Sequence, residues 1–267
     1  MNTKLGTLLI ALKFLVFVAI GSDLKPSYGG RSFSEWASQL DPHMPIAVGQ
    51  EPPEVVAIGH IGTNALPILV QWISQKDPAG TSCLHPSRGM QAVMGFGILG
   101  STARPTIPKL TRLAMSLPDR ERYERCVQAL ACIGPESLPS FNTFLTKGHP
   151  EIQFSAIGWL PAFHTNAVVV MPAVIRCLTG RNKEVGWKAA DELSRLDIPA
   201  PVLIPALTNA LPSASASARA RILRCLLWIG PPARGAVPAI RAALKDSNRL
   251  VREEATNALQ YVDLKPN

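Results

Sequence analysis

Apolar and polar positions along the chain follow a pattern that returns every thirty to thirty-eight residues. Apolar stretches end, and new ones rich in Ala and Pro begin, at six junctions spaced 38, 34, 30, 33 and 33 residues apart: Gly62, Gly100, Gly134, His164, Asp197 and Gly230. Within each unit the apolar residues recur at the spacing of an amphipathic helix. Such a period is typical of a helical solenoid, in which each unit packs only on its neighbours.

The last unit shows its elements most clearly. Residues 236–244 and 251–262 both carry apolar side chains at helical spacing. The polar residues 245–248 between them predict a tight turn, in which Asp246 or Ser247 caps the second helix. Each unit is therefore expected to be a helix, a turn and a second helix.

Two rows of residues support this alignment of the repeat units independently of the glycines at the junctions. Aligning the units places a row of mostly small residues in the middle of the second helices: Ala92, Cys126, Ala156, Ala189, Ile222 and Ala255. One turn later lies a row of larger residues: Phe96, Leu130, Leu160, Leu193, Leu226 and Leu259. Small side chains on one stripe let neighbouring helices approach closely, so both rows are expected to be buried.

These motifs resemble the HEAT repeat family. Residues 230–240, which read Gly-Pro-x-Ala-x-x-Ala-Val-Pro-Ala-Ile, are similar to the family's junction and first helix. Asp246-x-x-x-x-Val251-Arg252-x-x-Ala255-x-x-Ala258-Leu259 is similar to its turn and second helix. The resemblance spans roughly residues 52–263 and is weaker over 164–228. It implies an all-α fold, a right-handed α-solenoid (α-α superhelix) of about six HEAT-like helix pairs.

The chain is expected to divide into four parts. Residues 1–22 form a signal peptide or an N-terminal membrane anchor, residues 23–31 a linker, and residues 32–51 a capping segment; the repeat array covers residues 52–263. Residues 28–40, which read Tyr-Gly-Gly-Arg-Ser-Phe-Ser-Glu-Trp-x-x-x-Leu and include the start of the capping segment, resemble a segment found ahead of HEAT arrays in exported bacterial proteins of unassigned function. The apolar stripe of the capping segment predicts a helix that covers the open end of the stack: Phe33, Trp36, Ala37 and Leu40.

Two interpretations of the first residues compete. Residues 5–21 are apolar apart from Lys13, Thr7 and two glycines, and cleavage after the small-x-small sequence at residues 19–21 would make them an export signal. Retained, the same residues would tether the chain to a membrane with Lys13 near the middle of the span, which is costly. Both interpretations place the protein outside the cytoplasm, in a bacterial envelope, and the cleaved signal is favoured.

Composition and motifs limit the kinds of site that the chain is expected to hold. The five cysteines form no CxxC and have no histidine at a metal-ligand spacing, so neither a zinc site nor a full disulfide framework is expected. The sequence contains no HExxH, GxSxG or phosphate-binding glycine motif, and its five histidines are isolated. The chain is therefore not expected to be an enzyme or to hold a cofactor. Its net charge of +8 is compatible with acidic or anionic partners.

The candidate site lies on the inner face of the stack, because the resemblance implies that second helices line the concave side. Basic and aromatic residues on these helices could form a shallow groove for an acidic peptide or another polyanion: Tyr123, Lys183, Trp187, Arg219, Arg249 and Arg252. An ordinary solvated helix face is the competing interpretation.

Three functions are compatible with these residues. The favoured one is a non-enzymatic, monomeric interaction scaffold that binds a protein or peptide on its concave face. Nucleic-acid binding or base repair is an alternative, disfavoured by the absence of a concentrated Lys/Arg track. A HEAT-like bilin lyase is the other, supported only by analogy of fold.

Overall fold

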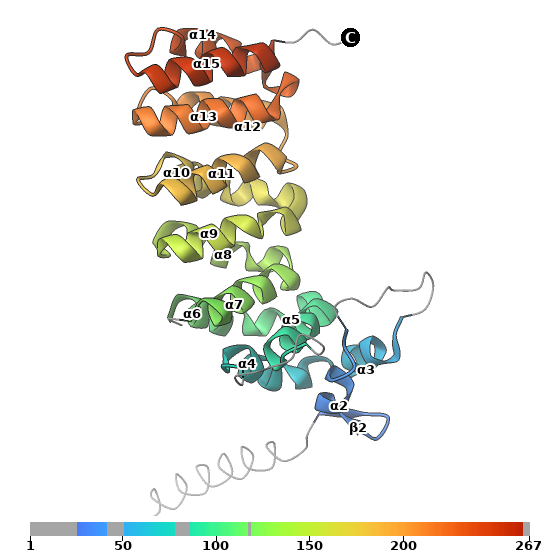
Figure 1. Ribbon diagram of the computed structural model, residues 1–267. Coiled ribbons are helices and arrows are strands. Elements are labelled where there is room, and N and C mark those ends of the chain that lie inside the picture. The colour runs from blue at the N-terminus through green and yellow to red at the C-terminus, as the bar shows by residue number, and fades with distance from the viewer. Residues whose placement is uncertain (1–25, 42–50, 78–85, 117–118, 264–267) are drawn as a thin grey trace, which may run out of the picture.

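Helices in two stacked layers make up most of the protein, as the computed structural model shows for residues 26–41, 51–77, 86–116 and 119–263. The first helices of the pairs form the layer that lies behind in Figure 1: α4 (Leu66–Ser74), α6 (Ile107–Ser116), α8 (Leu138–Lys147), α10 (Met171–Thr179), α12 (Ala200–Ala210) and α14 (Val237–Ala243). The second helices form the other layer: α5 (Arg88–Leu99), α7 (Arg120–Ile133), α9 (Pro150–Gly158), α11 (Lys183–Arg195), α13 (Ala216–Ile229) and α15 (Arg249–Val262). The predicted all-α solenoid is confirmed.

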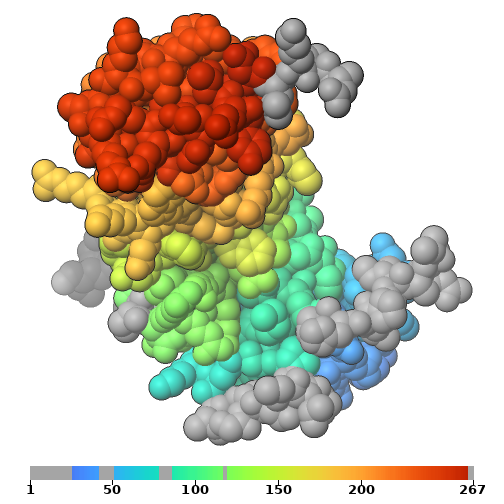
Figure 2. Space-filling view, turned by 45° about the horizontal axis from the view of Figure 1, so that its top comes forward, coloured from blue at the N-terminus to red at the C-terminus, as the bar shows by residue number. Residues whose placement is uncertain are grey.

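Each second helix packs on the second helices of the adjacent units, so the core runs along the whole array. The row of small residues has no exposed surface: Ala92, Cys126, Ala156, Ala189, Ile222 and Ala255. The larger residues one turn later are also fully buried, except for the partly buried Leu259. In the space-filling view the units follow one another as bands from the amino-terminal to the carboxy-terminal end (Figure 2).

The predicted glycine junctions adopt a backbone that glycine alone adopts readily. Positive φ values are found at Gly62 (+60°), Gly100 (+50°), Gly134 (+109°) and Gly230 (+69°). Each turn continues as a short 3₁₀ segment that leads into the next first helix: η1 (Gly62–Ala65), η2 (Gly100–Thr106), η3 (Pro135–Ser137) and η5 (Pro231–Ala236). The junction at Asp197 differs, because the backbone at Leu196 is extended and α12 starts three residues after Asp197.

His164 takes the place of a glycine in the junction between α9 and α10. It lies inside η4 (Leu160–Val170) with φ 48° and ψ −133°, close to the values at Gly62, Gly100 and Gly230. A side chain with a Cβ atom is strained in this region of backbone space.

Replacing His164 by Gly should therefore stabilise the protein. Relief of the strain outweighs the extra entropy of glycine in the unfolded chain, and we expect a gain of about 1 kcal/mol in the free energy of unfolding. Urea denaturation followed by circular dichroism measures it. The reverse change, Gly100→His, should cost a similar amount, and a destabilised His164→Gly variant would refute the strain argument.

The amino-terminal residues cover the first helices of the array. Strands β1 (Ser27–Tyr28) and β2 (Arg31–Ser32) form an antiparallel hairpin that starts in the segment predicted as a linker and ends at the first residue of the predicted capping segment. It leads into α2 (Phe33–Ala37), which packs on α3 (Pro53–Ile61). Phe33 and Ala37 have no exposed surface and join the continuous core. The predicted signal or anchor at residues 1–22 lies outside the described residues.

Two helical stretches, Pro53–Ser74 and Leu160–Thr179, are long and apolar enough by composition to cross a membrane. About half of each is buried inside the solenoid, and each is interrupted by a residue with positive φ, Gly62 or His164. Helices of a protein core meet the same criteria of length and composition.

The four cysteines in the described part of the chain are free thiols: Cys126, Cys132, Cys177 and Cys225. Burial raises the pKa of Cys126 to about 12 and that of Cys177 to about 11. Cys83 lies outside the described residues. The thiols are therefore part of the apolar core rather than a reactive centre.

One buried arginine joins two neighbouring units. The side chain of Arg221 on α13 is 1% exposed. Its Nε atom donates to the carbonyl of Leu178 and its Nη2 atom to the carbonyl of Gly180, both at 2.7 Å; Nη1 donates to Ser217 at 3.2 Å. Because α10 ends at residue 179, these carbonyls have no partner in the helix, and Arg221 supplies one. The guanidinium crosses α11 at Gly186, where a Cβ atom would lie 2.6 Å from Nε.

A second buried arginine crosses a helical glycine in the same way three units earlier, although its partners are different. Arg125 on α7 is 5% exposed and pairs with Asp77 and Glu121, and it also donates to Ser87 at 3.4 Å. A Cβ atom on Gly89 of α5 would collide with its guanidinium. In both cases the glycine lies three residues before the small residue of one second helix, and the arginine lies one residue before that of the next.

Candidate functional site

The six residues predicted for partner binding all lie on second helices, but they do not form one basic groove. Tyr123 on α7 is 4% exposed and packs edge-on against His149, and burial raises the pKa of its phenol. Lys183 and Trp187 lie near the start of α11 and are exposed. The arginines are on the last two second helices: Arg219 on α13, Arg249 and Arg252 on α15.

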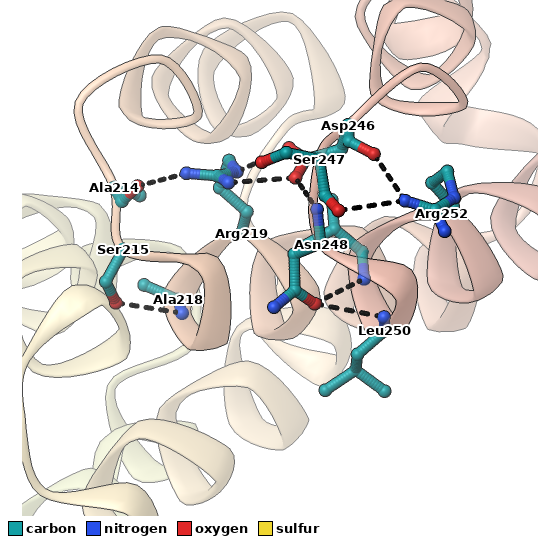
Figure 3. A network of polar contacts seen from close by, with 10 residues as sticks. Ala214, Ser215, Ala218, Arg219, Asp246, Ser247, Asn248, Leu250 and Arg252 are labelled. Atoms are coloured by element: carbon teal, nitrogen blue, oxygen red, sulfur yellow. Dashed lines mark hydrogen bonds and ion pairs between the residues drawn. The ribbon is translucent and has the colours of Figure 1, made fainter.

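Arg219 and Arg252 hold the turn before α15 (Figure 3). Arg219 binds both carboxylate oxygens of Asp246, at 2.7 and 3.0 Å, and donates to the carbonyl of Ala214. Arg252 donates to the carbonyl of Asp246 at 2.7 Å. The prediction that Asp246 or Ser247 caps α15 is wrong, because Asn248 accepts from the first backbone amides. Asp246 instead accepts from Arg219 and from the amide of Asn248.

The contacts of Asp246 give a prediction for the pH dependence of stability. Its hydrogen bonds with Arg219 and with the amide of Asn248 lower the pKa of the carboxyl. The stabilisation is therefore present above the unfolded pKa, near pH 4, and is lost as the pH falls through the lower folded pKa. Asp246→Asn should reduce the free energy of unfolding by about 1 kcal/mol at pH 7, after allowing for solvent screening.

Urea denaturation at pH 7 and at pH 3 measures this difference between wild type and Asp246→Asn. The difference in the free energy of unfolding between the two proteins should be smaller at pH 3, because wild type loses the same charge there. A difference that is the same at both pH values would exclude an electrostatic contribution from this carboxylate.

Ion pairs neutralise most of the positive charge on the second helices. Six of these arginines and lysines have acidic partners within the protein at 2.5 to 2.8 Å: Arg120 with Glu124, Lys188 with Glu192, Arg195 with Asp191, Arg219 with Asp246, Arg224 with Glu254, and Arg249 with Glu253. The hydrogen bond to Glu254 raises the pKa of Arg224. The second-helix face is therefore less basic than the net charge of the chain implies.

Aromatic side chains are the prominent exposed feature of this face. Phe154 on α9 is 40% exposed, Trp187 on α11 is 37% exposed and Trp228 on α13 is 42% exposed. Together with three charged residues they line one shallow cleft of about 610 Å³. We call this cleft the aromatic surface, defined by Phe154, Glu184, Trp187, Lys188, Asp191 and Trp228.

The aromatic surface adjoins a second, smaller cleft. This cleft of about 290 Å³ lies between the starts of α7, α9 and α11 and shares Phe154 and Glu184 with the aromatic surface. Arg224 lies between the two indoles, with its guanidinium carbon 6.0 Å from the ring of Trp187 and 5.9 Å from that of Trp228. Since Arg224 is bound to Glu254, it holds the rings in place without leaving a free charge.

Sequence reasoning identified Trp187 but missed Phe154 and Trp228. Phe154 occupies the same register position as Trp187, two residues before the small residue of its helix, and this equivalence was visible in the sequence. Trp228 lies further along its helix, so the sequence alone did not link it to the other two. Sequence reasoning also did not identify Arg221 as buried at the interface between units.

No arrangement for catalysis is found among the described residues. Within them, no group of three His, Cys, Asp or Glu side chains is placed to hold a metal ion. His149 pairs with Glu151 at 2.7 Å, and His60 stacks on Tyr28 with ring centroids 4.7 Å apart. What the face offers is a broad contact area with aromatic side chains.

Comparisons with known proteins gave one family match and several similar solved structures. A family model described as HEAT repeats matches residues 204–265. No curated protein matches the chain. Similar solved structures include Kap95 in a complex with Nup1 (14% identity, TM-score 0.46, covering 86% of this chain and 33% of Kap95) and Kap121p bound to Nup53p (13%, 0.44, 76% and 25%). Human deoxyhypusine hydroxylase in complex with glycerol is also similar (17%, 0.30, 86% and 96%).

The stacked helix pairs define an α-solenoid of helical repeats. Residues 204–265 match the HEAT repeat family, and this match includes the last unit, whose motifs are clearest in the sequence. The chain spans a quarter of the length of Kap121p and a third of that of Kap95.

Proposed function

We propose that this protein is a non-enzymatic interaction scaffold that binds a segment of a protein partner at the aromatic surface. The observation that carries the proposal is the set of three exposed aromatic rings, on three successive second helices, that line one open cleft. Exposed tryptophans are costly in water and are enriched among the residues that dominate binding energy at interfaces. A solenoid face also offers area without a deep pocket, which suits a polypeptide better than a small molecule.

The double variant Trp187→Ala/Trp228→Ala tests the proposal. We expect at least a tenfold loss in capture of the partner from extracts of the native cells, quantified by mass spectrometry against wild type, because both rings lose their contact area. Since both side chains are partly exposed, the thermal unfolding midpoint should change little.

A matched control removes exposed apolar side chains elsewhere. Val169 in η4 and Val202 in α12 are 68% and 42% exposed and do not line the aromatic surface. Val169→Ala/Val202→Ala should capture the partner as wild type does. Equal capture by the tryptophan variant and this control would rule out the aromatic surface as the contact.

We also propose that the scaffold works as a monomer outside the cytoplasm, in a bacterial envelope, with residues 1–22 as its export signal or anchor. The apolar run at residues 5–21 supports this. Cell fractionation with sequencing of the mature amino terminus tests the location, and light scattering of the purified protein tests the monomer. Recovery from the cytoplasm with Met1 intact would contradict export.

A further inference from the structure

The aromatic surface has almost no free charge. Lys188 pairs with Glu192 at 2.5 Å and Asp191 pairs with Arg195 at 2.6 Å. Arg224, between the two indoles, is bound to Glu254. A ligand for this surface therefore gains more from stacking on the rings than from ion pairs with these groups.

Glu184 is the exception. Its carboxylate is exposed, lines both clefts and makes no hydrogen bond or ion pair within the described part of the chain. It lies on the same helix as Trp187, three residues earlier, so both side chains lie on one side of α11. The nearby cations Arg181 and Lys183 do not line either cleft. This position favours a ligand with one positive charge next to the part that stacks.

The spacing of the rings indicates the conformation of the ligand. Phe154 and Trp187 occupy equivalent positions on adjacent second helices, so their separation follows the distance between helix axes, about 8–10 Å in packed helices. A polyproline II helix has three residues per turn and rises about 9 Å in that turn. One face of such a helix therefore presents one residue to Phe154 and the residue of the next turn to Trp187.

The shallowness of the cleft favours the same ligand. An open surface buries little of any ligand, so a flexible chain would lose much of its binding free energy on becoming ordered. A proline-rich segment is already extended before binding and loses less entropy. Its pyrrolidine rings are compact and apolar, and they are suited to contact with aromatic faces.

We infer that the occupant of the aromatic surface is a proline-rich segment of a protein partner, in the polyproline II conformation, with a basic side chain that pairs with Glu184. The inference rests on the proposed function and specifies the partner's chemistry. Proline rings stack on Phe154, Trp187 and Trp228, and the single basic residue sets the direction in which the segment lies.

Selection from a phage-displayed library of random dodecapeptides, on the immobilised full chain, tests the inference. Wild type should enrich peptides with prolines three residues apart and an adjacent Arg or Lys by about tenfold over the unselected library. The same selection is run on Trp187→Ala/Trp228→Ala, on Glu184→Gln and on the control Glu136→Gln, which makes the same change at an exposed glutamate of η3. Affinities of selected synthetic peptides are then measured by calorimetry.

We expect Glu184→Gln to lose the enrichment of basic residues while keeping that of proline, and Glu136→Gln to behave as wild type. The tryptophan variant should lose both. Selection of tryptophan-dependent peptides without spaced prolines, or of acidic peptides, would overturn the inference and leave the proposed function standing. Peptides that bind equally well to wild type and to the tryptophan variant would contradict both the inference and the proposed function.

Discussion

Replacing Arg221 by Leu should lower the free energy of unfolding by about 3 kcal/mol, the largest effect that we expect from one side chain outside the apolar core. Leucine retains the apolar volume of the arginine stem but leaves the carbonyls of Leu178 and Gly180 without their donor. An acceptor left unpaired in a buried site costs roughly 1–3 kcal/mol, and two are affected here. The contact that joins α13 to the end of α10 is also lost.

Urea denaturation followed by circular dichroism measures the loss, and hydrogen exchange at the end of α10 locates it. Arg195→Leu is the matched control, because its side chain is 66% exposed and pairs with Asp191 one turn away. This control should change stability by about 0.5 kcal/mol or less. If the two variants are equally stable, Arg221 does not contribute as a buried donor.

The positions of the helices could be predicted from the sequence because they depend on local chemistry. Glycine and proline mark the junctions, and the rows of small and large residues mark the buried stripe. The glycine recurs at four of the six junctions and the two rows recur in all six units, so a weak unit is placed by its neighbours. His164 illustrates this, since the period assigned it to a junction and the structure gives it a glycine-like backbone.

The ion-pair partners of the charged side chains could be predicted only in part. Pairs four residues apart on one helix, such as Arg120 with Glu124, follow from the sequence. The partners of Arg219 and Arg224 lie 27 and 30 residues away, in the next unit, and depend on how the units stack. Without these pairs the face was predicted to be more basic than it is.

The contact between glycine and arginine can be recognised in the sequence only when the repeat units are aligned with one another. Gly89 and Gly186 occupy the same position in their second helices, and each is followed in the next unit by an arginine one residue before the small row. Neither residue is informative alone, because helical glycines are usually unfavourable and arginines are usually exposed. Their co-occurrence in two interfaces indicates that the arginine needs the missing Cβ atom.

Replacing Gly186 by Ala should therefore destabilise the protein, although alanine is the better helix former. The new Cβ atom would lie 2.6 Å from Nε and 2.7 Å from Cζ of Arg221, whose guanidinium is held by bonds to two carbonyls. Moving it breaks those bonds, which outweighs the gain of about 1 kcal/mol in helix propensity. We expect a net loss of about 2 kcal/mol. Gly97→Ala on α5 is the control, because its Cβ atom would be 4.0 Å from the nearest neighbour, and it should be stabilising.

The double variant Gly186→Ala/Arg221→Leu distinguishes the loss of these hydrogen bonds from steric crowding in general. With Arg221 already replaced by Leu, the bonds that Gly186→Ala would break no longer exist, and leucine is shorter than arginine. The same substitution should then cost far less than in wild type, or stabilise through helix propensity, giving a coupling of about 2 kcal/mol between residues in direct contact. Additive effects in the denaturation cycle would mean that Gly186 is needed for another reason and that the arginine does not depend on it.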